Sequence, residues 1–113
     1  MSVALIALAL AQATAAPKAP IDVLFGFYRI VAFHERADDL KCGGPERKAA
    51  DDAFVEIRKR LIARYGEQGF SPPRHPPSGP GDCRVVMMVY QTNLADYRKF
   101  VDSTLAAAPA PGE

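Results

Sequence analysis

Two cysteines are the residues of this chain best suited to covalent chemistry. Cys42 and Cys83 do not form a CxxC motif, so a thioredoxin-like redox pair is not expected. Two cysteines in a small exported domain usually pair with each other, because oxidising compartments preserve disulfides. The sequence therefore predicts one structural disulfide, Cys42–Cys83, and no cofactor.

The same cysteines allow an alternative in which one thiol stays free. Cys83 precedes Arg84 near the expected start of a helix, where the helix N-terminus and the guanidinium would both favour a thiolate. His75 lies upstream in a proline-rich segment and could approach as a base. This alternative is a small thiol- or metal-dependent activity centred on Cys83 and His75.

His34, Asp38 and Cys42 are spaced i, i+4, i+8 and share one face of a helix. All three residue types bind zinc and similar metals. However, three ligands spread over nearly three turns cannot all reach one ion at about 2.0–2.3 Å. We therefore expect no metal site here, but a solvated polar helix end with a contact between His34 and Asp38.

Composition restricts the class of protein. The chain has 113 residues, of which 49% are hydrophobic and 24% charged, as is typical of a globular domain. Lys and Arg total 14 and Asp and Glu total 13, so the net charge is only +1. Such a balance gives no general field that would attract a polyanion, and we expect no nucleic-acid partner.

Residues 1–15 resemble a secretory signal peptide. They hold an apolar run and an Ala13-Thr14-Ala15 cleavage pattern, although no basic residue precedes the run. A buried helix and a membrane anchor are the alternatives. The apolar run is too short for a bilayer core about 30 Å thick, which takes roughly 20 residues. We therefore expect export to the periplasm or the exterior, with no stable membrane span in the mature chain.

The rest of the chain divides into a linker over residues 16–21, one helical domain over residues 22–107 and a flexible tail over residues 108–113. The first helix is expected over residues 22–42. Its centre is apolar nearly all round, which predicts burial against more than one neighbour, whereas its end, residues 34–39, is expected to be exposed. The two glycines that follow Cys42 are expected to stop it.

Residues 45–65 form the clearest predicted helix. Pro45 suits the first turn and Gly66 follows as a stop. Basic residues fill the last turns, which complements the helix dipole. Apolar residues recur every three or four positions along one face, widened by Val55 and Ile62. The members of this stripe are Ala50, Phe54, Ile57, Leu61 and Tyr65.

A third helix is predicted from an N-cap at Asp82 to about Ala107. Residues 84–90 alone are β-branched enough to be a buried strand, and a short apolar run does not distinguish the two. The helix is favoured because the apolar stripe continues beyond this run without a break. Met87 and Met88 are interpreted as core residues. The stripe comprises Val86, Tyr90, Leu94, Tyr97, Val101 and Leu105, with Phe100 beside it.

Residues 67–81 connect the second and third helices and hold five of the ten prolines, which excludes a helix or a central strand. A helix over residues 45–65 rises roughly 30 Å, and a polyproline-like chain of this length reaches up to about 45 Å. We predict a semi-rigid crossover that lets the second and third helices run parallel. The segment would also suit recognition by a partner, with Arg74 and His75 as projecting residues.

These observations predict an all-α fold of three long helices, with a Pro-rich crossover between the second and third and one disulfide. The sequence has no phosphate loop, nucleotide fingerprint or Ser-His-Asp arrangement. We expect a small exported, non-enzymatic structural or interaction module with a protein partner or self-association. The alternatives are the thiol- or metal-dependent activity above and the binding of an apolar small ligand between the first and third helices.

Overall fold

The computed structural model describes residues 18–77 and 79–107. This part of the chain forms three helices, α2 (Ile21–Asp39), α3 (Pro45–Tyr65) and α4 (Cys83–Ala107), and contains no strand. The predicted all-α fold is confirmed, and the strand alternative for residues 84–90 is wrong. The expected signal peptide (1–15) and tail (108–113) lie outside the described residues.

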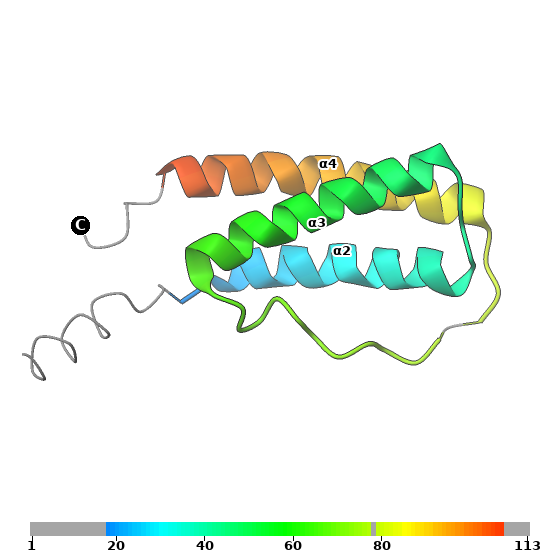
Figure 1. Cartoon of the computed structure of the whole chain (residues 1–113), viewed down its shortest axis with the longest axis horizontal. Coiled ribbons are helices and arrows are strands. Elements are labelled where there is room, and N and C mark those ends of the chain that lie inside the picture. Colours follow the sequence, from blue (N-terminus) through cyan, green and yellow to red (C-terminus); the bar gives the residue numbers. More distant parts are fainter. Residues whose placement is uncertain (1–17, 78, 108–113) are drawn as a thin grey trace, which may run out of the picture.

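The helices form a bundle in which α2 runs antiparallel to both α3 and α4 (Figure 1). The connection between α3 and α4, residues 66–82, is named the return segment here. It runs back along the bundle beside α2, so that α3 and α4 point the same way. Within residues 18–77 and 79–107, no helix has the length and apolar character needed to cross a membrane.

The predicted apolar stripes meet between the helices. Ile57 and Leu61 of α3 and Tyr90 and Val101 of α4 are fully buried. Val55 is the exception, since it is 47% exposed and does not widen the stripe of α3 as predicted. It lies five positions from Ala50 and two from Ile57, off the buried face. The other large buried side chains are Val23, Phe27, Ile30, Val31, Phe70, Met87, Leu94 and Tyr97.

One face of α2 is more exposed than its all-round apolar composition predicts. Ile21, Phe25 and Tyr28 are 68%, 64% and 40% exposed, and their i, i+4, i+7 spacing forms one outward stripe. The neighbours of α2 (α4, α3 and the return segment) therefore cover only part of its circumference.

Helix α2 ends earlier than predicted, because the stop is made at Lys41 and not at the glycines. The N–H of Cys42 donates to the carbonyl of Ala37 at 2.9 Å, and the N–H of Lys41 donates to that of Asp38 at 3.0 Å. Lys41 has φ 56°, in the left-handed region. These are the bonds of a Schellman C-cap, whose left-handed position glycine usually occupies.

Replacing Lys41 with glycine should therefore stabilise the fold by about 0.5–1 kcal/mol. A left-handed conformation costs a residue with a Cβ about 1–2 kcal/mol, part of which is offset by the greater freedom of unfolded glycine. Chemical denaturation of Lys41→Gly measures this, and Lys41→Ala is the control, since it removes the charge but keeps the Cβ. Equal stability of the two variants would contradict the backbone explanation.

The return segment is fastened to the polar end of α2. Arg74 pairs with Asp38 at 3.0 Å and also contacts Asp39. The N–H of His75 donates to Glu35 Oε2 at 3.0 Å. Glu35 is 8% exposed, so the prediction that this helix end is solvated is wrong. The reason is that the return segment covers it. Arg74 is tied to α2 by its ion pairs, and His75 is tied by its backbone, while the two side chains remain 47% and 76% exposed.

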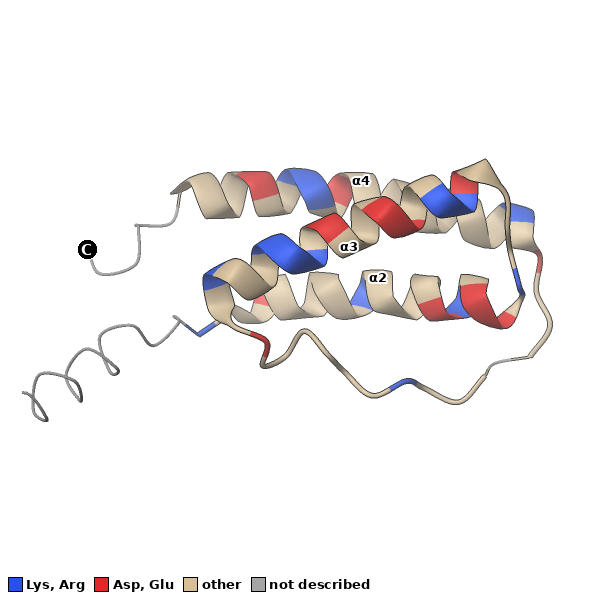
Figure 2. Ribbon diagram, viewed as in Figure 1, with Lys and Arg blue, Asp and Glu red and all other residues tan. Residues whose placement is uncertain are grey.

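Charges of both signs alternate along α3 (Figure 2). Two ion pairs join this helix to its parallel neighbour α4. Arg98 contacts Glu56 at 2.9 Å, and Arg60 contacts Asp102 at 2.7 Å. Both pairs are partly exposed, so each contributes at most about 1 kcal/mol. These ion pairs contribute little to the free energy of unfolding. Their main effect is to favour one relative orientation of the contacting faces of α3 and α4.

Candidate functional site

The predicted disulfide joins the turn after α2 to the first residue of α4. The Cα atoms of Cys42 and Cys83 are 5.6 Å apart and the sulfur atoms are bonded. Asp82 caps α4, as predicted: its Oδ1 accepts the N–H of Arg84 at 2.8 Å. Because the chain has two cysteines in all, neither is a free thiol in this state.

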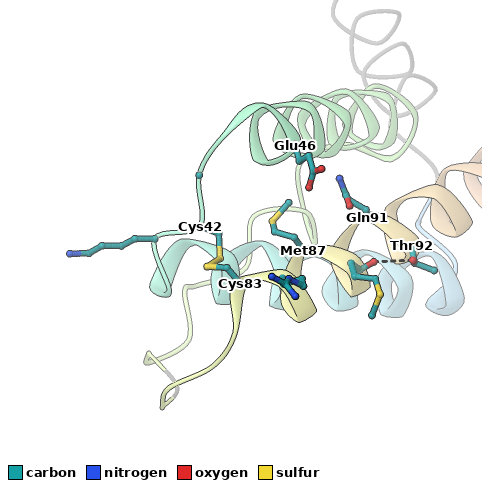
Figure 3. A pocket seen from close by; sticks show the side chains of 10 residues that line it. Cys42, Glu46, Cys83, Met87, Gln91 and Thr92 are labelled. Atoms are coloured by element: carbon teal, nitrogen blue, oxygen red, sulfur yellow. Dashed lines mark hydrogen bonds between the residues drawn. A yellow bond between two sulfur atoms is a disulfide. The ribbon is translucent and has the colours of Figure 1, made fainter.

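An open cavity of about 570 Å³ adjoins the disulfide. Figure 3 shows Met87 between the disulfide and the side chains of Glu46 and Gln91. The cavity is built by three parts of the chain, since the turn after α2, the first turn of α3 and the first turns of α4 meet at this end. Its lining residues are Lys41, Cys42, Gly43, Glu46, Cys83, Arg84, Met87, Met88, Gln91 and Thr92.

The two methionines of this cavity differ in environment. Met87 is buried, as predicted for a core residue, whereas Met88 is 60% exposed and the prediction of a core position is wrong for it. The physical reason is that α4 has one buried face, defined by Met87, Tyr90 and Leu94, and the next residue along points about 100° away. The disulfide end therefore carries an exposed, conformationally adaptable thioether.

His75 takes no part in this cavity. Its Nδ1 lies 3.6 Å from Glu35 Oε2, and its backbone is held by the same carboxylate. A thiol-dependent activity would require His75 to lie beside Cys83 as a base, and the contacts of His75 are with α2 instead. Among the residues that are described, no three His, Cys, Asp or Glu side chains form a group that could hold a metal ion.

A partly buried polar cluster that reaches the turn after α2 was missed by the sequence analysis. His34 Nδ1 lies 3.1 Å from Asp51 Oδ1 and 3.1 Å from the hydroxyl of Tyr90. Arg47 donates through Nε to Asp51 at 2.9 Å and through Nη1 to the carbonyl of Cys42 at 3.0 Å. The predicted contact between His34 and Asp38 is wrong, because His34 faces α3 and Asp38 pairs with Arg47 and Arg74.

The cluster joins all three helices through one carboxylate. Asp51 accepts hydrogen bonds from the Tyr90 hydroxyl, at 3.1 Å, and from Arg47. Its neighbour Asp52 pairs with Lys48 on the exposed side of α3. The two aspartates thus point to different faces, as their adjacency predicts. In the sequence, such a cluster is indicated by polar residues that interrupt an apolar stripe. The sequence alone does not show which of these polar residues from different helices contact one another.

Burial and the nearby Asp51 raise the pKa of the Tyr90 hydroxyl, and burial raises that of Tyr97. An unfolded tyrosine has a pKa of about 10. The stabilisation linked to these raised pKa values is therefore fully present below about pH 10 and is lost as the pH rises above it. Both hydroxyls remain hydrogen-bond donors at neutral pH, to Asp51 and to the carbonyl of Val23.

Tyr90→Phe should lower the free energy of unfolding by about 1.5 kcal/mol at pH 8, because it removes a hydrogen bond to a carboxylate. The variant should also lose less stability between pH 9 and pH 11 than the wild type. Urea denaturation at these pH values measures both effects, with Tyr28→Phe as the exposed control. A pH dependence identical to that of the wild type would rule out Tyr90 as a source of alkaline destabilisation.

A hollow of about 270 Å³ lies between α2 and α4, where the sequence placed an apolar ligand. Four of its lining residues carry charged or amide groups, Asp22, Arg29, Asn93 and Asp96, but the surface that faces the hollow is mostly apolar. Many of the apolar residues of these two helices pack on one another in the core. The binding of an apolar ligand between these helices stays a prediction.

The fold and the candidate sites define a small disulfide-linked three-helix bundle. No protein-family model matches the chain, and neither the curated proteins nor the solved structures compared with it give a match. The function is therefore argued from the residues of this chain alone.

Proposed function

We propose that this protein is an exported, non-enzymatic interaction module that receives apolar side chains of a partner protein in the cavity at its disulfide end. The observation that carries the proposal is the combination of an apolar floor with a polar rim. Met87 and the Cys42–Cys83 disulfide supply the floor, and Glu46, Arg84 and Gln91 line the same cavity.

Protein interfaces commonly have an apolar centre surrounded by polar groups. Methionine suits such a centre, because its flexible thioether adapts to different partners. Met88 and Val85 are 60% and 51% exposed on the first turns of α4, which extends the apolar surface beyond the cavity. The opposite charges of Glu46 and Arg84 would orient a partner that carries complementary charges.

Export is supported by the disulfide and by the Ala13-Thr14-Ala15 pattern. Disulfides persist in oxidising compartments and are rare in the cytosol. The test is the intact mass of protein from its native host, with and without reduction and thiol alkylation. We expect a mass that begins near Ala16 and alkylation only after reduction. An uncut chain that alkylates twice without reduction would overturn both the location and the role of the disulfide.

The docking surface is tested by photo-crosslinking in the native host. A photoreactive phenylalanine analogue at Met88 should form one discrete adduct with a partner protein. The same analogue at Lys99, which is exposed further along α4, is the matched control and should form none. A third variant carries the analogue at Phe25, on the exposed stripe of α2.

Three results would overturn the proposal. A discrete adduct from Phe25 and none from Met88 would place the interaction on α2. An adduct of Met88 with a second copy of this chain would make the cavity a self-association surface. The absence of a discrete adduct from any position would argue against a stable partner.

A further inference from the structure

The exposed face of α2 has the residue spacing of a helix–helix interface. Ile21, Phe25 and Tyr28 are followed on this face by the exposed Ala32, in steps of four, three and four residues. Alternating steps of three and four residues place apolar side chains along the line where two helices of a coiled coil meet. These four residues are named the α2 seam here. Their spacing favours a second helix as the occupant of this face.

A hollow of about 290 Å³ lies beside the α2 seam, between α2 and the return segment. Tyr28 belongs to both the seam and the hollow, and the other lining residues are Val31, Pro72, Pro73 and His75. In packed helices, each projecting side chain inserts between residues of the facing helix. The hollow therefore provides space for a large side chain of a second helix next to Tyr28.

Two exposed charges of opposite sign flank the α2 seam on its other side. Asp22 and Arg29 lie seven residues apart, on the same edge of the helix. Ion pairs along one helix form between residues three or four apart, so these two are too distant to pair within one chain. Asp22 accepts the N–H of Val23 at 3.0 Å, and none of the ion pairs between described residues includes Asp22 or Arg29.

An antiparallel second copy would match the apolar side chains of the seam. When Phe25 of each chain lies level with Tyr28 of the other, Ile21 of each chain lies level with Ala32 of the other, a large residue opposite a small one. Phe25 of the second copy then faces Tyr28 and the hollow beside it. Aromatic side chains in such contacts pack in stacked or edge-on arrangements.

The same arrangement would also pair the flanking charges. Two-fold symmetry between antiparallel helices brings the same edge of each helix together, whereas a parallel pair brings opposite edges together. Asp22 of one chain then lies within about 3 Å, along the helix axis, of the level of Arg29 of the other chain. The second ion pair follows by symmetry. In a parallel pair the charged edge would instead meet the edge that carries Leu24 and Val31.

We propose that the α2 seam binds the α2 seam of a second copy of this chain in an antiparallel, two-fold symmetric dimer with reciprocal Asp22–Arg29 ion pairs. The inference goes beyond the proposed function, because this surface shares no residue with the cavity at the disulfide end. Obligate dimers bury roughly 2,000 Å² or more, which is more than this short seam provides. We therefore expect reversible association with a Kd on the order of 10–100 μM.

Sedimentation velocity of the protein purified from its native host measures this association at concentrations below and above the expected Kd. The wild type should change from monomer to dimer over this range. Phe25→Ser should weaken dimerisation at least about tenfold, because it removes the large side chain at the centre of the seam. Since Phe25 is 64% exposed, its variant should melt like the wild type. Met88→Ser is the control, because Met88 is a similarly exposed residue at the disulfide end, and it should dimerise normally.

A wild type that stays monomeric over this range would overturn the proposal, as would normal dimerisation of Phe25→Ser. Normal dimerisation of Phe25→Ser together with weak dimerisation of Met88→Ser would place self-association at the disulfide end.

Charge reversal tests the antiparallel pairing. Asp22→Arg and Arg29→Asp should each weaken self-association about tenfold, because both ion pairs become repulsive. Mixed in equal amounts, the two variants should form a heterodimer, since every arginine then faces an aspartate. The double variant Asp22→Arg/Arg29→Asp should dimerise like the wild type. Native mass spectrometry of the mixture identifies the heterodimer.

The matched control pair is Asp52→Arg and Lys99→Asp, which makes the same charge changes at exposed positions of α3 and α4. Both control variants should dimerise like the wild type, alone and when mixed. A mixture of the Asp22 and Arg29 variants that forms no more dimer than its components would overturn the proposed pairing.

Discussion

The Cys42→Ala/Cys83→Ala variant should unfold at a midpoint roughly 20 °C below that of the oxidised wild type. The disulfide joins residues separated by 41 positions. On the chain-entropy treatment, closing a loop of about this length stabilises the fold by about 4 kcal/mol. For a small domain each kcal/mol shifts the melting midpoint by about 4–8 °C. Since small domains have a net stability of as little as about 5 kcal/mol, the variant should be only marginally folded.

Thermal melting followed by circular dichroism measures this effect. The wild type melted in the presence of a reductant is the control, because it loses the bond but keeps both side chains. The two samples should melt within a few degrees of each other. A variant that melts at the temperature of the oxidised wild type would show that the disulfide does not stabilise the fold.

The second large effect is expected at Gly26, where alanine should destabilise the protein by about 3 kcal/mol. A Cβ at this position would lie 2.3 Å and 2.6 Å from ring carbons of Tyr97. Tyr97 is buried and donates from its hydroxyl to the carbonyl of Val23 at 2.6 Å, so the ring cannot move without losing that bond. Overpacking costs about 1–3 kcal/mol, and a buried acceptor left unpaired costs about as much. The better helix propensity of alanine recovers only about 1 kcal/mol.

Two variants separate this steric effect from a general effect of replacing glycine. Gly43→Ala should change stability by less than about 0.5 kcal/mol, because no atom beyond its chain neighbours lies within 4 Å of its added Cβ. In a Tyr97→Leu background, the Gly26→Ala substitution should cost less than it does in the wild type. Chemical denaturation of all the variants measures the coupling, and strictly additive effects would contradict a contact between the two residues.

The fold could be predicted from sequence because its signals are local or periodic. The stripe from Ala50 to Tyr65 defines α3 without reference to any other element. The pairing of Cys42 with Cys83 was accessible because the chain offers these two cysteines and no others. The C-terminal end of α2 was harder to predict. It depends on Lys41 adopting a left-handed conformation, which glycine adopts at most such helix ends.

The candidate sites were predicted less well, because they depend on which polar residues of different helices contact one another in the folded protein. His34, Asp51 and Tyr90 each look unremarkable within their own helix, and the register between helices brings them together. The burial of Glu35 depends on the return segment, whose path was predicted from its length but whose contacts were not. Arg58 was interpreted as one of several basic residues at a helix end, and its position against Phe70 is a tertiary contact.

The covalent connection at one end of the bundle also determines how the molecule would bear mechanical load. The disulfide closes a ring that contains all of α3 and the return segment, while the start of α2 and the end of α4 lie together at the opposite end (Figure 1). Tension applied to the chain ends would pass from α2 through the sulfur atoms into α4 and would bypass the ring. The start of α2 and the end of α4 would then separate first. The 41 positions between Cys42 and Cys83 would not be stretched, because the disulfide carries the tension across them. After reduction of the disulfide, this segment could extend under tension to a length of about 140 Å, at about 3.4 Å per residue.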